Sequence, residues 1–210
     1  QGILMTDDRS IVEKEFIPNF FKNYPRGRFL EIGANDGEPI GQNEPIWPLV
    51  EMGWGGVYCE PNPHACSKLL KNIKPYKDII VFNGAITETG GLNTFYMSDE
   101  YPMASSFDPL WMPKQKYAQP NTEQYSIITS TITMQDLVNY VGSDFDCISL
   151  DIECEMEVYE KIISSFDWRL FHKCKVLVIE GCSHITQAYF ESIGFVCAGK
   201  SPHNVIFTRN

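Results

Sequence analysis

The chain has 210 residues, of which 43% are hydrophobic, so its length suits one domain with a sizeable core. Its formal net charge is −10, which argues against a general binder of nucleic acids or anionic membranes, because both need a basic surface. No apolar run is long enough to span a bilayer.

Short runs rich in Ile, Val, Leu and Phe alternate with stretches of helical periodicity. The runs lie at 28–34, 55–60, 78–86, 145–152 and 175–181, and the helical stretches at 44–53, 64–73, 134–142, 157–166 and 185–194. Uninterrupted apolar runs are typical of buried parallel strands, and their alternation with helices predicts a doubly wound α/β fold. Residues 195–210 predict two strands joined by a Lys-Ser-Pro-His turn, which would form an antiparallel edge hairpin.

Residues 90–131 interrupt this alternation with many Pro, Ser and aromatic residues. We expect an inserted hairpin, a mobile loop, and a strand that enters the helix at 134. Aromatic faces bordered by hydrogen-bonding side chains suit a carbohydrate, although such a segment could close over any substrate. Ser105 and Ser106, in "MASSF", are the candidate substrate or lid contacts.

The seven cysteines are an odd number, none forms a CxxC pair, and most lie in apolar runs. This pattern favours reduced, buried thiols and a cytoplasmic protein over disulfides, and it lacks the ligand spacing of a zinc site. The chain begins with Gln1 rather than Met, so we expect a single domain, 1–210, taken from a longer chain or carrying a tag remnant.

The first two predicted strands end in a pattern typical of a nucleoside site. Glu31 and Gly33 begin a GxxxG turn that ends at Gly37, and Glu60 closes the next strand. Glycines permit a sharp turn and a close backbone approach to a ligand. Glu60 could accept hydrogen bonds from both hydroxyls of a ribose. The turn lacks the GxGxxG that binds a pyrophosphate. Its acidic character instead suits the cationic S-adenosylmethionine, although a glycine turn required only for packing is the alternative.

The same geometry indicates further cofactor contacts. The backbone of Ala34 and Asn35 would line the methionine end, with Asn43 as a polar candidate near the next helix. Asn83 and Ala85, at the end of the third strand, could contact the adenine, unless Asn83 belongs to a plain turn.

The chain resembles the FkbM-type family of class I methyltransferases. The similar stretches, from about residue 28 to 182, are "FLEIGANDG", "GQNEPIWPLVEMGWGGVYCEPNP", "VFNGAIT", "TITMQDLV", "ISLDIECEMEVYEKI" and "VLVIEG". The resemblance implies a Rossmann-like seven-stranded sheet, S-adenosyl-L-methionine as methyl donor, and O-methylation of sugars or polyketide-type products. This chain departs from the family's Asp-x-Glu-Gly motif at Cys154, which replaces the glycine between Glu153 and Glu155.

Acidic residues close the two later strands. Asp151 and Glu180 should project from adjacent strand ends, where one carboxylate could act as general base toward a hydroxyl. Alternatively both could bind Mg²⁺ or Mn²⁺, an arrangement similar to that of catechol-type O-methyltransferases. Glu153 and His184 are further catalytic candidates. Acids at strand ends also cap helices, so a structural role is the alternative.

The sequence thus predicts an S-adenosylmethionine-dependent O-methyltransferase that acts on a glycan or glycoside hydroxyl, with no nucleic-acid partner and no membrane span. Fusion to or association with glycosyltransferase domains would fit this acceptor. A polyketide, lipid or other small-molecule hydroxyl is the alternative acceptor. A noncatalytic nucleoside-binding module within a larger protein is the alternative of another class.

Overall fold

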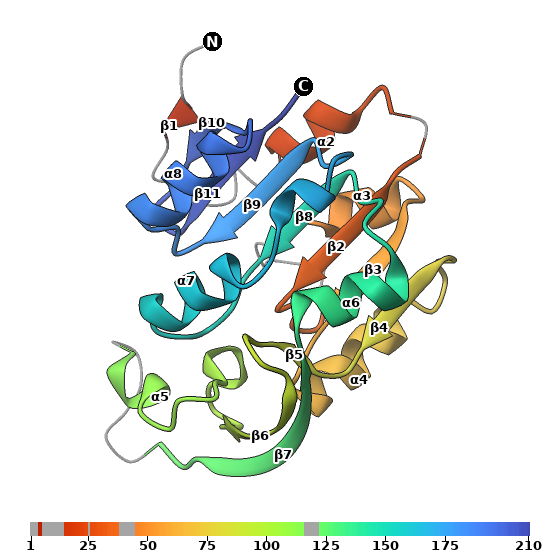
Figure 1. Ribbon diagram of the computed structural model, residues 1–210. Coiled ribbons are helices and arrows are strands. Elements are labelled where there is room, and N and C mark those ends of the chain that lie inside the picture. Colours follow the sequence, from red (N-terminus) through yellow and green to blue (C-terminus); the bar gives the residue numbers. More distant parts are fainter. Residues whose placement is uncertain (1–3, 6–14, 25, 38–44, 116–121) are drawn as a thin grey trace.

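The computed structural model describes residues 4–5, 15–24, 26–37, 45–115 and 122–210. Its main feature is a large sheet with the strand order β1-β10-β11-β9-β8-β2-β3-β4 (Figure 1). The bounds of these strands are β1 Leu4–Met5, β2 Arg28–Ile32, β3 Gly55–Cys59, β4 Ile79–Phe82, β8 Cys147–Leu150, β9 Val176–Glu180, β10 Val196–Lys200 and β11 Asn204–Thr208. β11 pairs antiparallel with both β9 and β10, and the remaining pairs are parallel. The fold is therefore the predicted Rossmann-like, mostly parallel α/β sheet with an antiparallel C-terminal hairpin.

Helices cover both faces of this sheet (Figure 1). Their bounds are α2 Ile17–Phe21, α3 Trp47–Glu51 and α4 Pro63–Asn72 on one face, and α6 Met134–Val141, α7 Met156–Ser164 and α8 His184–Ser192 on the other. Successive strand residues enter opposite cores: Phe29 packs with α2 and α3, whereas Leu30 packs with α6 and α7. This is the two-residue period of a strand buried on both faces, and it explains the continuous apolar runs of the sequence.

Two elements lie outside the predicted alternation. β1 adds two residues to the edge of the predicted seven strands by pairing with β10, where Leu4 lies opposite Gly199. α2 has only five residues, but Ile17 and Phe21 are completely buried, and the Phe21 ring lies 4.7 Å from that of Trp54. Both elements are too short for a periodic pattern, so tertiary packing defines them.

A second sheet of three strands is separate from the first. Its order is β5-β7-β6, with the bounds β5 Ala85–Ile86, β6 Gly91–Met97 and β7 Tyr125–Ile132. The predicted strand 78–86 divides at the Asn83-Gly84 turn, and its second part joins this sheet. β7 enters α6 as predicted, but it is also the hairpin partner of β6 along its length, from Gly91 opposite Thr131 to Met97 opposite Tyr125.

Between β6 and β7 lie the 3-10 helix η2, Pro102–Ala104, and the short helix α5, Trp111–Lys114. Figure 1 shows this segment beyond the carboxyl ends of β2, β8 and β9. The small sheet and α5 therefore face the sheet edge at which the candidate site residues gather.

All seven cysteines are free thiols, and five of them are buried. Burial raises the pKa of the Cys59 and Cys174 thiols above their usual range, which suits inert packing residues. Among the described residues, no helix has the length and apolar character needed to cross a bilayer.

Candidate active site

The Gly33 turn joins the ends of β2, β3 and β8. The amide N–H groups of Gly33 and Ala34 both donate to the carbonyl of Cys59, and the Asp151 N–H donates to the Ile32 carbonyl at 2.8 Å. Gly33 has a φ of +83°, and a Cβ there would lie 1.6 Å from the Asp151 carbonyl oxygen. The close contact with Asp151, the residue after β8, is therefore enough by itself to require glycine at position 33. It also fixes the turn and Asp151 relative to each other.

Glu60 lies directly after β3 and is 6% exposed. One carboxylate oxygen accepts a hydrogen bond from the backbone N–H of Asn35 and the other from the backbone N–H of Asn62, each at 2.7 Å. Burial and, to a smaller extent, the nearby Asp36 carboxylate nevertheless raise the pKa of Glu60 to about 8, against the lowering effect of the two backbone N–H groups. The side chain thus holds the Asn35 turn against the start of α4.

Asn35 and Glu31 occupy different environments in the same turn. Asn35 has a positive φ of 48°, a conformation that Asn tolerates better than most residues. Glu31 is buried in β2 between Tyr58 of β3 and Ser149 of β8. Ala34 is also buried and packs in the core beneath α2 and α3. Asn43 lies outside the described residues.

The two adenine candidates are separated by the division of the strand. Asn83 is exposed, and its amide donates to the Glu60 carbonyl at 2.8 Å. Ala85 is buried in β5, opposite Thr131 of β7. Asn83 therefore stabilises the chain that follows β3 through this hydrogen bond, whereas Ala85 belongs to the three-stranded sheet.

Asp151, Glu153 and Glu180 form a cluster of carboxylates, which we call the acidic cluster. One carboxylate oxygen of each lies within 4.8 Å of the others, and all three residues are half-buried. β8 and β9 are parallel neighbours, with Leu150 opposite Ile179, so the residues that follow them meet at one edge. This juxtaposition of Asp151 and Glu180 is the one that the sequence predicts, and Glu153 joins it.

Glu153 is held by the segment that precedes β7. The Trp111 indole Nε1–H donates to its carboxylate at 2.9 Å, and the Ser106 hydroxyl donates to its backbone carbonyl at 2.6 Å. Lys114 forms an ion pair with Glu155, the residue before α7. The β8–α7 loop is therefore attached to the inserted segment by side chains.

The two serines predicted to contact the acceptor are buried. The Ser105 hydroxyl donates to the Pro102 carbonyl at 2.7 Å and accepts from the Asn62 amide at 3.5 Å. Ser106 bonds to Glu153, as described above, and its backbone pairs with Tyr96 of β6. In this structure both hydroxyls bind protein groups and stabilise the position of the inserted segment.

A histidine other than the predicted one lies beside the acidic cluster. His184 is exposed at the first position of α8, whose N-cap is Ser183. His203 lies in the β10–β11 turn, and its Nδ1 is 3.8 Å from a Glu180 carboxylate oxygen. The pairing of Asn204 with Glu180 brings it there. The turn is visible in the sequence, but its approach to Glu180 depends on the antiparallel insertion of β11 next to β9.

Asn62 is another residue that the sequence reasoning did not single out. Its side-chain oxygen accepts hydrogen bonds from the backbone N–H groups of His64 and Ala65 and so caps α4. Its own backbone N–H donates to the Glu60 carboxylate. An Asn directly before a Pro at the first helical position is a recognisable N-cap signal, so its capping role could have been predicted.

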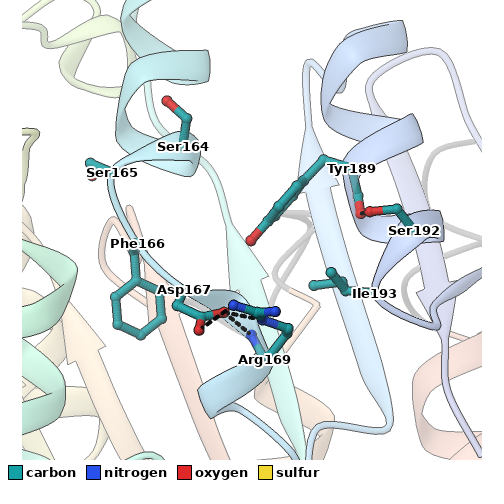
Figure 2. A pocket seen from close by; sticks show the side chains of 8 residues that line it. All are labelled: Ser164, Ser165, Phe166, Asp167, Arg169, Tyr189, Ser192 and Ile193. Carbon is teal, nitrogen blue, oxygen red and sulfur yellow. Dashed lines mark hydrogen bonds and ion pairs between the residues drawn. The ribbon is translucent and has the colours of Figure 1, made fainter.

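A groove of about 610 Å³ lies in another part of the molecule, and Figure 2 shows the side chains that line it. Its lining includes Ser164 at the end of α7, Tyr189 and Ser192 of α8, and the ion pair of Asp167 with Arg169. α7 and α8 begin near the ends of β8 and β9 and run back along the sheet. Their last residues, and hence this groove, lie toward the edge opposite the acidic cluster.

No protein-family model and no curated protein sequence matches this chain. Solved structures of similar fold include magnesium protoporphyrin IX methyltransferase from Synechocystis with bound S-adenosylmethionine, at 10% identity and a TM-score of 0.49, covering 96% of this chain and 79% of that one. A protein described as a methylase, HI0767 of Haemophilus influenzae, is 13% identical with a TM-score of 0.48, covering 94% and 88% of the two chains. At these identities the likeness concerns the fold alone.

Proposed function

We propose that this chain binds S-adenosylmethionine and transfers the methyl group to a sugar hydroxyl. The observation that carries this proposal is the joining of two sets of residues at one sheet edge. Gly33, on the turn beside Glu60, packs directly on the backbone of Asp151, which belongs to the acidic cluster. A donor site and an acceptor site must be adjacent for methyl transfer, because the rate depends on the positioning of the two reacting groups.

Glu60 has the chemistry to hold a ribose. Each of its carboxylate oxygens accepts one backbone N–H and can accept a second hydrogen bond, so the pair suits two adjacent hydroxyl donors. The backbone of Gly33 to Asn35 would then line the methionine end. When bound, S-adenosylmethionine supplies an electrophilic methyl carbon. The FkbM-type resemblance of residues 28–182 supports this donor over a dinucleotide.

The acidic cluster would act on the acceptor. A sugar hydroxyl is a weak acid, so its proton must be removed as its oxygen attacks the methyl carbon and the carbon–sulfur bond breaks. We favour a divalent cation held by Asp151, Glu153 and Glu180, because three carboxylate oxygens within 4.8 Å suit Mg²⁺ or Mn²⁺. Such a cation lowers the pKa of a bound hydroxyl. Asp151 acting alone as general base is the alternative.

The composition of the inserted segment supports a sugar as the acceptor. Its aromatic residues include Trp111 beside Glu153, and Phe95 and Phe107, whose ring centroids are 4.9 Å apart. A ring face next to carboxylates suits a sugar, which presents apolar faces bordered by hydroxyls. A polyketide or lipid hydroxyl is the alternative acceptor.

The test is transfer of labelled methyl groups from S-adenosylmethionine to a panel of glycosides, with a panel of polyketide and lipid alcohols beside it. Asp151→Asn should lower turnover about 100-fold or more while donor affinity changes little. Asp144→Asn is the matched control, because Asp144 is exposed and pairs with Lys173 away from the cluster. Excess EDTA should abolish transfer, and Mg²⁺ or Mn²⁺ should restore it.

Three results would contradict parts of this proposal. Near-normal turnover in Asp151→Asn would remove Asp151 from the chemistry. Full activity in excess EDTA would exclude the divalent cation and leave Asp151 as a general base. Tight donor binding without transfer to any hydroxyl would favour a noncatalytic nucleoside-binding module.

A further inference from the structure

One segment of this acidic chain carries only positively charged side chains. Four of its 17 basic residues, and none of its 27 acidic residues, lie between residues 61 and 77. Two of the four, Lys68 and Lys71, belong to α4, and the other two, Lys74 and Lys77, lie between α4 and β4. We call these four lysines the α4 ridge. All of them are exposed, so the ridge is a basic surface on a protein of net charge −10.

The charges of the α4 ridge are largely unpaired within the protein. The buried residues of α4 lie on its other face, so Lys68 and Lys71, one turn apart, point away from the core. The side chain of Lys68 is 67% exposed, and its Nζ lies 4.0 Å from an Asp36 carboxylate oxygen, a long contact for an ion pair. Within the described part of the chain, Lys71, Lys74 and Lys77 form no ion pair. These lysines can therefore bind an external anion without first breaking such a contact.

The ridge begins beside the candidate site. The α4 N-cap, Asn62, donates its backbone N–H to the Glu60 carboxylate and its side-chain N–H to the Ser105 hydroxyl of the inserted segment, at 2.7 and 3.5 Å. Lys68 follows six residues later, about 9 Å along the helix. From there α4 runs along the β4 edge of the main sheet (Figure 1). The start of α4 thus connects the ridge to both sides of the proposed reaction site.

We infer that the α4 ridge binds an anionic chain, namely the part of the acceptor glycan that extends beyond the methylated sugar. This inference rests on the sugar acceptor proposed above, and it adds carboxylate, sulfate or phosphate groups to that acceptor. Ammonium groups attract such groups as point charges. The attraction should weaken with salt, because exposed charges are screened.

The shape of the ridge favours a glycan over the other common polyanions. A single row of lysines suits a narrow chain, whereas the plane of an anionic membrane would also approach exposed acids nearby, Glu51 of α3 and Asp78 before β4. A single-stranded nucleic acid binds through exposed aromatic rings on which its bases stack. The ring of Tyr76, the one Phe, Tyr or Trp between residues 61 and 77, is half-buried and packs against Trp47 at 5.6 Å.

The experiment measures binding of fluorescently labelled dextran oligosaccharides to the intact protein by anisotropy, with neither donor nor acceptor substrate present. The probes are uncharged, sulfated and carboxymethylated dextran of the same length. The ridge variant changes Lys68, Lys71 and Lys74 to Gln, and the control variant carries the same change at three exposed lysines outside the ridge, Lys22, Lys161 and Lys173.

The wild type should bind at least one charged dextran more tightly than the uncharged one, and added salt should weaken this binding. The ridge variant should lose about 10-fold or more in affinity, because three exposed ion pairs are removed. The control variant, which has the same net charge, should bind as the wild type does. The preferred probe also distinguishes a sulfated from a carboxylated chain.

Three results would overturn the inference. One is equal wild-type affinity for charged and uncharged dextran. Another is an equal loss in the ridge and control variants, which would show that only the net charge matters. The third is ridge-dependent binding of phosphatidylserine vesicles or of an oligonucleotide without binding of either charged dextran. No methyl transfer to any hydroxyl would overturn the proposed function, and with it the assignment of the chain to an acceptor, whereas the dextran titration alone decides whether the ridge binds an anionic glycan.

Discussion

The two sides of the candidate site are built in different ways. On the proposed donor side, Gly33 and Glu60 follow neighbouring parallel strands, and their contacts are with backbone groups: the Asp151 carbonyl and the backbone N–H groups of Asn35 and Asn62. On the proposed acceptor side, Glu153 accepts hydrogen bonds from the side chains of Trp111 and Ser106, which lie in the segment between β6 and β7. The donor side is therefore fixed by the main sheet, and the acceptor side by contacts between distant segments.

This difference indicates how each side would respond to change. Backbone contacts in a close-packed sheet tolerate no added atom, so a single methyl group on the donor side should disrupt the fold. Contacts made by side chains can be removed one at a time. The acceptor side should therefore lose stability or function in small steps, and the predictions below compare the two responses.

Gly33→Ala should have the largest effect, because the new Cβ would overlap the Asp151 carbonyl oxygen. We expect a loss of more than about 4 kcal/mol in the free energy of unfolding, or no folded protein. Gly53→Ala is the control, since Gly53 has the same φ of +83° but nothing within 4 Å of its Cβ position. It should cost only about 1–2 kcal/mol for the left-handed conformation. Equal losses in urea unfolding of the two variants would show that the overlap does not matter.

Glu60 should make stability depend on pH. Its pKa rises on folding from 4.5 to about 8, so between these values the folded chain holds a proton that the unfolded chain has released. The free energy of unfolding should therefore fall as pH rises through this window, by an amount on the order of a few kcal/mol.

Glu60→Gln removes the titrating group and should remove this contribution. It should also lower stability at pH 5, because an amide has one oxygen to accept the two backbone N–H groups that Glu60 accepts. Urea unfolding at pH 5 and pH 8 measures both effects. The same pH dependence in wild type and variant would show that Glu60 does not titrate in this window.

Ser106→Ala should have the smallest effect. It removes the hydrogen bond that the hydroxyl donates to the Glu153 carbonyl and the weaker one that it accepts from the Asp108 backbone N–H, and it should lower the free energy of unfolding by about 1–2 kcal/mol. Ser126→Ala is the control, because Ser126 is exposed on β7, opposite Tyr96 of β6. It should leave stability unchanged within error. A loss as large as that of Gly33→Ala would mean that the acceptor side is as rigid as the donor side.

The sequence predicted the main sheet well because its signals are local. Each long apolar run contains a strand of the main sheet, and all five helical stretches contain a helix. The short elements β1 and α2 were missed, since their positions depend on contacts with β10 and Trp54. The division of 78–86 between two sheets was also missed, because nothing local shows that β5 pairs with β7, more than forty residues later.

The same distinction applies to the site. The meeting of Asp151 with Glu180 followed from the order of parallel strands, and the structure confirms it. The contacts of Trp111 with Glu153 and of His203 with Glu180 could not be predicted, because each joins segments whose approach depends on the whole fold. The roles proposed for these residues remain predictions.

The most direct test of the central claim is a calorimetric titration of the wild-type protein with S-adenosylmethionine and, separately, with NADH, repeated with Glu60→Ala. We predict that S-adenosylmethionine binds and NADH does not. Measured above pH 8, where Glu60 is ionised, Glu60→Ala should weaken the binding by about 1.5–3 kcal/mol, which is the usual contribution of hydrogen bonds to a charged acceptor. Binding of NADH but not of S-adenosylmethionine would contradict the account as a whole, and unchanged affinity in a folded Glu60→Ala protein would remove Glu60 from the donor site.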